Sequence, residues 1–175
     1  YIAVTGVQTC ALPISSGNLW EASVKFWGHS IRNIDSKGRL MLPPDFRDVI
    51  QDGDAPGQVM LTRFDACVYG YAQPDWDQIV DSFQHLNLAR PDMRRFQRFF
   101  LGGAMQVPLD KQGRILVPPH LRKYAALDKE VVLAGSGRRF EIWNLERYER
   151  EMDDFDSSAD QIMTELTESG YELRL

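Results

Sequence analysis

Asp35-Ser-Lys-Gly-Arg39-Leu-Met-Leu-Pro43-Pro44-Asp-Phe-Arg47 returns later in the chain as Asp110-Lys-Gln-Gly-Arg114-Ile-Leu-Val-Pro118-Pro119-His-Leu-Arg122. The offset is 75 residues at every matched position, and Val59-Met-Leu61 matches Val131-Val-Leu133 at an offset of 72. A pattern of this length and chemistry does not recur by chance. The chain therefore contains two copies of one structural unit, and this unit decides the fold.

Each copy predicts the same series of elements. An Asp at the first position and a Gly at the fourth are typical of a type I turn between two short strands. After the first turn, Leu40 and Leu42 alternate with Arg39 and Met41, which predicts a strand with one buried face. The proline pair ends that strand, and its second proline suits the first turn of a helix. A further hairpin completes a unit of about 45 residues, which is too small for a stable core and must pack against its sibling.

The segments outside the two copies are expected to be helical. Between the copies, Trp76, Ile79 and Phe83 recur at helical spacing, and Pro91 starts a second predicted helix over residues 92–101. After the second copy, we predict a helix over residues 145–155 and a weakly amphipathic acidic tail over residues 157–175, with helix as one alternative near residues 162–166. The predicted organisation is two units at 28–75 and 104–147, a helical connector at 76–103, and a C-terminal helix with its acidic tail at 148–175.

Residues 1–23 are expected to be a non-native leader. Residues 4–14 look like the in-frame translation of a common sequencing adapter, and we expect the native start near Val24. The first fifteen residues also lack the basic segment and the uninterrupted apolar segment of a secretory signal. Without the leader, Cys67 is the single thiol, so no disulfide framework is expected and the cysteine usage indicates a reducing compartment.

Charge is unevenly distributed along the chain. The formal net charge is −5, but residues 150–175 hold eight acidic residues against two arginines, so the rest of the chain is close to neutral. A near-neutral body binds nucleic acid only where cations are locally concentrated, preferably multiplied by the symmetry of an oligomer. No apolar run approaches the roughly 18–20 residues needed to cross a bilayer. The cysteines and histidines have no metal-ligand spacing, so neither a metal nor a cofactor is expected.

Four residues are expected to shape the two loops. Asp35 and Asp110 stand at the first position of each turn, where a carboxylate accepts backbone N–H groups and fixes the loop. Gly38 and Gly113 supply backbone freedom at a position where a side chain would strain the hairpin.

Four cations are the candidate DNA-binding residues. Arg39 and Arg114 stand directly after the turns, and Lys37 and Lys111 lie at or near the tips. A stiff hairpin can carry an arginine into a DNA groove, where the guanidinium binds O6 and N7 of guanine, while the lysines contact phosphates. The alternative is a purely structural ion pair between the Asp and the Arg of each loop, since such surface pairs are common and weak.

The doubled Asp-x-x-x-Arg motif, followed each time by a proline pair, resembles the MraZ family. Phe26-Trp-Gly-His-Ser30 and Leu101-Gly-Gly-Ala104 add to the resemblance, which covers residues 24–155. It implies an α+β fold similar to the AbrB and SpoVT swapped-hairpin regulators, with two tandem half-barrel units forming one pseudo-twofold β-barrel with flanking helices. It also implies a cytoplasmic, nucleoid-associated, ring-shaped homo-oligomer that binds short direct repeats in the promoter of the division and cell-wall gene cluster, usually as a repressor.

Two other functions fit parts of the sequence. Asp35 and Asp110 resemble a pair of catalytic carboxylates, but no nucleophile motif, phosphate-binding glycine loop or metal cluster accompanies them, so an enzyme is not expected. An oligomeric scaffold or antitoxin-like protein, with its acidic tail on a protein partner, fits the negative charge better than DNA binding does. The expected partners are promoter DNA and further copies of the chain, with no membrane and no small-molecule substrate.

Overall fold

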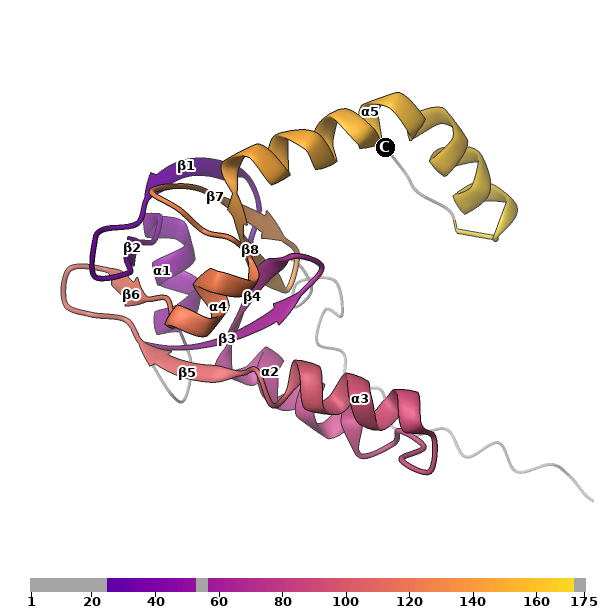
Figure 1. Cartoon of the computed structure of the whole chain (residues 1–175), viewed down its shortest axis with the longest axis horizontal. Coiled ribbons are helices and arrows are strands. Elements are labelled where there is room, and N and C mark those ends of the chain that lie inside the picture. Colours follow the sequence, from indigo (N-terminus) through magenta and orange to yellow (C-terminus); the bar gives the residue numbers. More distant parts are fainter. Residues whose placement is uncertain (1–24, 53–56, 172–175) are drawn as a thin grey trace, which may run out of the picture.

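The computed structural model describes residues 25–52 and 57–171, so the predicted leader lies outside the described residues (Figure 1). Each repeat supplies four strands and one helix. The first repeat contains β1 (His29–Asn33), β2 (Arg39–Met41), α1 (Pro44–Gln51), β3 (Gln58–Phe64) and β4 (Cys67–Ala72). The second contains β5 (Met105–Pro108), β6 (Arg114–Leu116), α4 (Pro119–Tyr124), β7 (Glu130–Ser136) and β8 (Arg139–Asn144). The remaining helices are α2 (Gln73–Phe83), α3 (Pro91–Phe100) and α5 (Leu145–Glu168).

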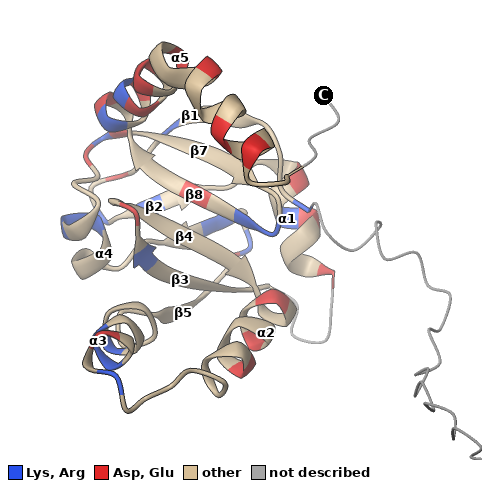
Figure 2. Ribbon diagram, turned by 90° about the vertical axis from the view of Figure 1, so that its right-hand side faces the viewer, with Lys and Arg blue, Asp and Glu red and all other residues tan. Residues whose placement is uncertain are grey.

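The two repeats exchange strands with each other. A six-stranded antiparallel sheet has the order β1-β7-β8-β4-β3-β5, and a separate two-stranded sheet joins β2 to β6 (Figures 1 and 2). The first strand of each repeat pairs with the third strand of the other, β1 with β7 and β5 with β3. When every strand is replaced by its equivalent in the other repeat, the same strand order results, read from the opposite edge of the sheet. Each repeat therefore completes the sheet of its sibling, which gives two units of this size a shared core.

The main core lies between the six-stranded sheet and the layer that holds β2, β6, α1 and α4. Leu40 and Ile115, at equivalent positions of β2 and β6, are almost fully buried in it. Phe26 and Phe140 are fully buried and contact each other edge to face, with ring centroids 5.4 Å apart. Full burial of a side chain of this size contributes roughly 1.5–3 kcal/mol.

A second, aromatic cluster covers the other face of the sheet. Helices α2 and α3 pack there, below the sheet in Figure 2, and Trp76 of α2 stacks on Phe100 of α3 at 5.9 Å between centroids. Phe83 also stacks on Phe100, at 5.8 Å. The predicted connector is therefore helical and is held against the sheet by its aromatic residues.

Prolines mark where the helices begin. Pro44 and Pro119 are the first residues of α1 and α4, and Pro91 is the first residue of α3. Proline is suited to this position because its fixed φ is helical and its missing N–H would have no intrahelical partner there. The helix starts predicted at these three prolines are confirmed.

The C-terminal segment differs from its prediction. The helix predicted over residues 145–155 and the helical alternative near residues 162–166 belong to one helix, α5, which has 24 residues and ends at Glu168. The side chain of Asn144 caps its first turn by accepting the N–H of Arg147 at 3.1 Å. No proline or glycine interrupts the segment until Gly170, which takes a φ of 83° just beyond the helix. None of the helices in the described ranges is long and apolar enough to cross a membrane.

Candidate nucleic-acid interface

Loop 1, residues 35–39, is held by its aspartate. The Gly38 N–H donates to the Asp35 carbonyl at 2.9 Å, and the Asp35 N–H donates to the Arg39 carbonyl at 3.0 Å. Asp35 Oδ1 accepts the N–H groups of Lys37 at 3.0 Å and of Arg39 at 2.9 Å. Gly38 has a φ of 88°, in the left-handed region that favours glycine. The loop is thus a type I turn closed by a glycine bulge, with its donors satisfied by one carboxylate.

Loop 2, residues 110–114, repeats this geometry. The Gly113 N–H donates to the Asp110 carbonyl at 2.9 Å, and the Asp110 N–H donates to the Arg114 carbonyl at 2.8 Å. Asp110 Oδ1 accepts the N–H groups of Gln112 at 2.8 Å and of Arg114 at 2.9 Å. Gly113 has a φ of 79°. The two loops are structural copies as well as sequence copies.

Each arginine pairs with the aspartate of its own loop. Arg39 Nε donates to Asp35 Oδ2 at 2.6 Å, and Arg114 Nε donates to Asp110 Oδ2 at 2.8 Å. The arginine side chains are still 36% and 25% exposed, respectively. Surface pairs of this kind contribute about 0–1 kcal/mol, and a guanidinium has five N–H donors. The pairing therefore orients each arginine without occupying all of its donors.

The same contacts lower the pKa of both aspartates. For Asp35 the largest cause is the backbone N–H of Arg39, opposed by desolvation and reinforced by the Arg39 guanidinium and the Lys37 N–H. For Asp110 the corresponding groups are the backbone N–H and guanidinium of Arg114 and the N–H of Gln112. Hydrogen bonds to the charged form favour ionisation. Both loops thus keep a carboxylate as their structural centre.

The loops are joined by a two-stranded ribbon, which we define as β2 and β6. Arg39 pairs with Leu116, Leu40 with Ile115, and Met41 with Arg114. Because Leu40 and Ile115 are buried, their neighbours in sequence lie on the opposite face of the ribbon. Both candidate arginines therefore share one outward face, although 75 residues separate them in sequence.

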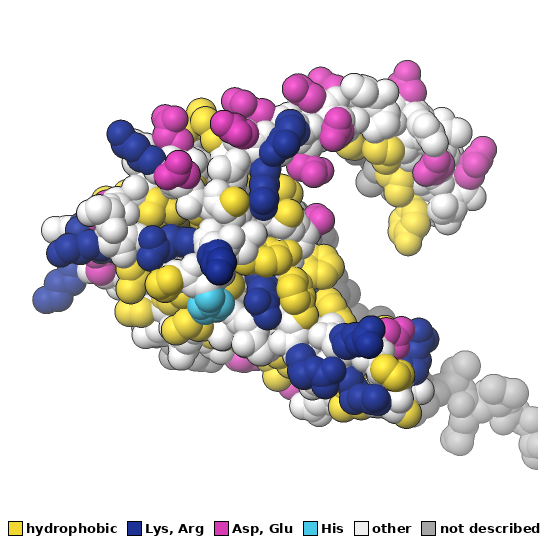
Figure 3. All heavy atoms as spheres, in the orientation of Figure 1, with side chains coloured by type: hydrophobic (Ala, Val, Ile, Leu, Met, Phe, Trp, Pro, Cys, Tyr) yellow, Lys and Arg dark blue, Asp and Glu magenta, His cyan; other side chains and the backbone are white. Residues whose placement is uncertain are grey.

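The loops also hold each other in register. The Leu42 N–H donates to the Gly113 carbonyl at 3.0 Å, and the Val117 N–H donates to the Gly38 carbonyl at 2.9 Å. Lys37 and Lys111 lie exposed in the two loops, beyond the ends of the ribbon. In Figure 1 the loops project from the left-hand end of the molecule, and in Figure 3 Lys and Arg side chains protrude from the same end.

Two arginines not included among the candidate residues complete this site. Arg47 of α1 and Arg122 of α4 occupy equivalent positions, and each lies against the loop glycine of the other repeat. A Cβ built on Gly38 would lie 2.8 Å from Arg122 Cζ, and one on Gly113 would lie 2.5 Å from Arg47 Cδ. Arg122 Nε donates to the Val117 carbonyl at 3.0 Å, whereas the buried Nε of Arg47 has no hydrogen-bond partner among the described residues. Both arginines stand at the end of the repeated motif, where they are expected to pair locally with their own helices, but each lies against the loop of the other repeat instead.

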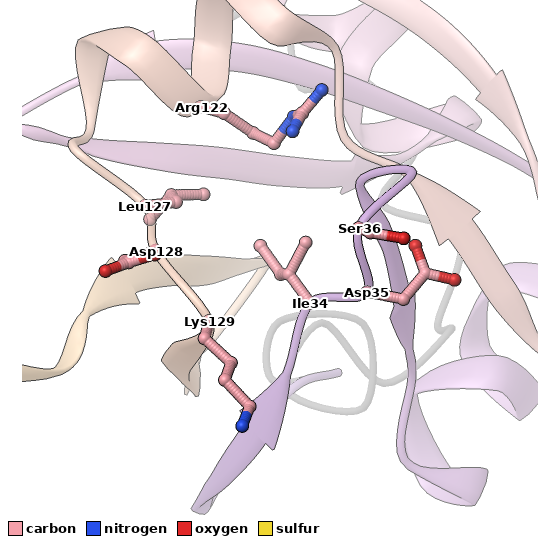
Figure 4. Close-up of a pocket in the computed structure, with 7 residues that line it drawn as sticks. All are labelled: Ile34, Asp35, Ser36, Arg122, Leu127, Asp128 and Lys129. Carbon is pink, nitrogen blue, oxygen red and sulfur yellow. The ribbon is translucent and has the colours of Figure 1, made fainter.

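A pocket of about 490 Å³ lies behind loop 1. Figure 4 shows Arg122 on one side of it, Asp35 and Ser36 on the loop side, and Lys129 on the segment that leads into β7. The pocket is lined by both acidic and basic side chains, which do not favour one class of ligand.

Opposite charges occupy separate parts of the molecule. Acidic side chains line the long α5 helix, which projects from the body, as Figures 2 and 3 show. Basic side chains gather on the loops and on α3, where Arg90 pairs with Asp92 and Arg94 donates to the carbonyls of Leu88 and Ala89. The loops and α3 thus carry two of the clusters of cations on the body.

The fold and the paired loops define a class: a tandem-repeat protein of mixed α and β structure whose two halves share a sheet and present two cationic hairpins. The family described as "MraZ protein, putative antitoxin-like" matches this chain twice, over residues 26–99 and 100–167. The chain belongs to the MraZ family, which confirms the resemblance found in its motifs.

Similar proteins named transcriptional regulator MraZ occur in several bacteria. That of Solidesulfovibrio magneticus is 48% identical over 150 residues, covering 85% of this chain and 99% of the relative. That of Maridesulfovibrio salexigens is 44% identical over 151 residues, covering 86% and 99%. That of Heliobacterium modesticaldum is 43% identical over 125 residues, covering 71% and 85%. The similarity thus extends through both repeats.

Proposed function

We propose that this chain is a transcriptional regulator that binds promoter DNA through loops 1 and 2. The proposal is supported by the family membership and, most directly, by Arg39 and Arg114 lying on one face of the ribbon with an exposed lysine in each loop. A two-stranded ribbon fits the DNA major groove, which is about 12 Å wide. There the arginines bind guanine edges, and Lys37 and Lys111 contact phosphates.

The proposal includes an assembly, because one pair of loops offers few charges. Several copies in a ring would repeat the loops at a fixed spacing, and short direct repeats in DNA would engage them together. The second and later contacts would then benefit from a high effective concentration. We further propose that the shared sheet closes as a barrel of two AbrB-like half-barrel units, that the target is the promoter of the division and cell-wall gene cluster, and that binding represses it in the nucleoid.

The second candidate function is an oligomeric scaffold or antitoxin-like protein. The observation that favours it is the acidic α5 helix, which projects from the body with an exposed apolar pair, Met152 and Phe155. Such a helix suits a basic protein partner better than it suits DNA. The two candidates place the binding surface at opposite parts of the chain and can be separated by mutation.

The test is a binding titration with the DNA directly upstream of the gene. We expect Arg39→Ala to weaken binding by about 5–150-fold, the range of a lost bidentate guanine contact, while the oligomer mass and circular dichroism stay unchanged. Arg150→Ala is the matched control, because Arg150 lies on the exposed face of α5. The affinity should also fall with salt by about 0.9 log units per log unit for each phosphate contacted. Unchanged affinity in a folded Arg39→Ala protein contradicts the proposal.

A further inference from the structure

The outward face of the ribbon carries two large apolar side chains as well as its arginines. Met41 is 38% exposed and Leu116 is 49% exposed. They occupy equivalent positions in the two repeats, and each is the direct cross-strand neighbour of an arginine, Met41 of Arg114 and Leu116 of Arg39. The face is therefore a diagonal arrangement of two guanidiniums and two apolar groups.

The fold does not require apolar side chains at these two positions. The opposite face of the ribbon already provides its core contacts through Leu40 and Ile115, which are 0% and 1% exposed. Alternation along a strand sends the next residue to solvent, where polar side chains are the usual choice. Two exposed apolar residues at equivalent places among four cations thus indicate a ligand that is both anionic and locally apolar.

The major groove of DNA has this combination. Its edges carry the hydrogen-bonding groups of guanine and, as their main apolar group, the C5-methyl of thymine, and phosphates flank both. Cross-strand neighbours on a ribbon have Cβ atoms about 4.5–5.5 Å apart, whereas successive base pairs are separated by about 3.4 Å. An arginine and its apolar neighbour therefore reach bases within one or two steps of each other.

We propose that Met41 and Leu116 recognise thymine methyl groups next to the guanines bound by Arg114 and Arg39. This inference rests on the proposed DNA binding and deepens it, since it assigns sequence selectivity to two further residues. Leu116 is expected to be the more selective for thymine, because its branched side chain has few rotamers. Met41 is expected to be less selective, because its unbranched thioether can adopt more conformations. The preferred sites contain a thymine within two base pairs of each contacted guanine.

The experiment removes the methyl groups without altering any base-pairing group. The upstream DNA is amplified once with dTTP and once with dUTP, and the affinity of the full-length protein for the two products is compared. We expect uracil to weaken wild-type binding by about fourfold for each methyl contacted, the effect of exposing one buried methyl. Leu116→Ala and Met41→Ala should each lower the dTTP affinity and bring the ratio of the two affinities closer to one.

The matched control is Leu88→Ala, because Leu88 is a similarly exposed apolar residue, 44% accessible, in the segment before α3. It should keep the wild-type ratio. Any change that uracil makes to DNA stiffness would act on every variant alike, so a ratio that falls only in Met41→Ala and Leu116→Ala reports the methyl contacts. Equal wild-type affinity for both DNAs overturns the inference, as does an unchanged ratio in the Met41→Ala/Leu116→Ala protein.

A third outcome also overturns the inference. If the double variant changes the oligomer mass and leaves the ratio unchanged, the apolar pair lies between copies of the chain. Failure of the proposed function looks different, because neither DNA would then bind, or Arg39→Ala would bind both as tightly as the wild type.

Discussion

Loops 1 and 2 have the same backbone conformation and hydrogen bonds, but they carry their exposed lysine at different positions. In both, an aspartate accepts two backbone N–H groups, a glycine takes a positive φ and an arginine closes the turn. The tip lysine, however, is the third residue of loop 1, Lys37, and the second residue of loop 2, Lys111, where Gln112 takes the third place. The turn uses only the backbone N–H of that third residue, so its side chain is free to vary. Duplication has kept the backbone conformation and allowed the two loops to present charge differently.

The packing beneath the loops also differs. A Cβ on Gly38 would lie 2.8–3.0 Å from the guanidinium of Arg122, while one on Gly113 would lie 2.5 Å from both Cδ and Nη1 of Arg47. The Arg122 Nε has a carbonyl partner and the buried Arg47 Nε has none among the described residues. The contact at Gly113 is therefore the closer of the two and involves Cδ as well as the guanidinium, although the hydrogen bonds of the two loops match.

The largest expected effect follows from this difference. We expect Gly113→Ala to destabilise the protein by about 2–5 kcal/mol, because a left-handed backbone strained by about 1–2 kcal/mol is combined with overpacking against Arg47. Gly38→Ala should cost about 1–3 kcal/mol, since the contacts of its Cβ with Arg122 would be longer than those of Gly113 with Arg47. Urea denaturation measures both.

Gly28→Ala is the control for backbone strain alone, because Gly28 has a φ of 75° and a Cβ there would meet nothing within 4 Å. We expect it to be the mildest of the three glycine substitutions. If Gly113→Ala is no more destabilising than Gly28→Ala, contact with Arg47 adds nothing to the backbone strain, and if it is no more destabilising than Gly38→Ala, the two loops do not differ in packing.

The next effect concerns the tips. Lys37→Ala and Lys111→Ala should each weaken binding to the upstream DNA by a few-fold and reduce the salt slope by about 0.9, the effect of one lost phosphate contact. Fluorescence anisotropy at several salt concentrations measures the slope. Lys123→Ala, an exposed lysine on the short helix α4, is the control. A normal slope for only one of the two loop variants would show that the loops contact DNA unequally.

The smallest effect is a pH dependence. The pKa of Asp35 and of Asp110 is lower in the folded chain than the ordinary value, mainly because of the backbone N–H of the arginine in each loop. Their contribution to stability is therefore complete above the unfolded pKa of about 3.9 and is lost as the pH falls through the folded pKa. We expect the thermal midpoint of Asp35→Asn/Asp110→Asn to fall less than that of the wild type on acidification below pH 4. Identical curves would mean that neither turn depends on its charge.

Much of the local structure could be predicted because it depends on residues a few positions apart. The repeated Asp and Gly fix the turns, and Pro44, Pro91 and Pro119 mark helix starts by limits on their own backbone. The extent of α5 could be predicted only in part: the acidic composition suggests a tail with helix near residues 162–166, but no helix-breaking residue interrupts the segment before Gly170 and the helix is continuous.

The site could be predicted only in part. The Asp-x-x-x-Arg motif identified the loops, but two chemistries were possible for the arginine, and the structure shows it paired with its aspartate and still partly exposed. The sequence suggested that Arg47 and Arg122 pair locally with their own helices, whereas each lies against a glycine of the other repeat, about 66 and 84 residues away, a contact that local spacing does not reveal.

By itself, the sequence determined that the chain is a duplicated unit with two rigid turns, cations beside them and an acidic end. Only the tertiary structure decided that β1 pairs with β7, that β5 pairs with β3, and that β2 and β6 bring both arginines and both exposed apolar residues to one face. The physical reason is the duplication. Since both repeats have the same alternation of buried and exposed residues, a strand's pattern fits its own repeat as well as the sibling's, and only the packing of the whole chain distinguishes the two.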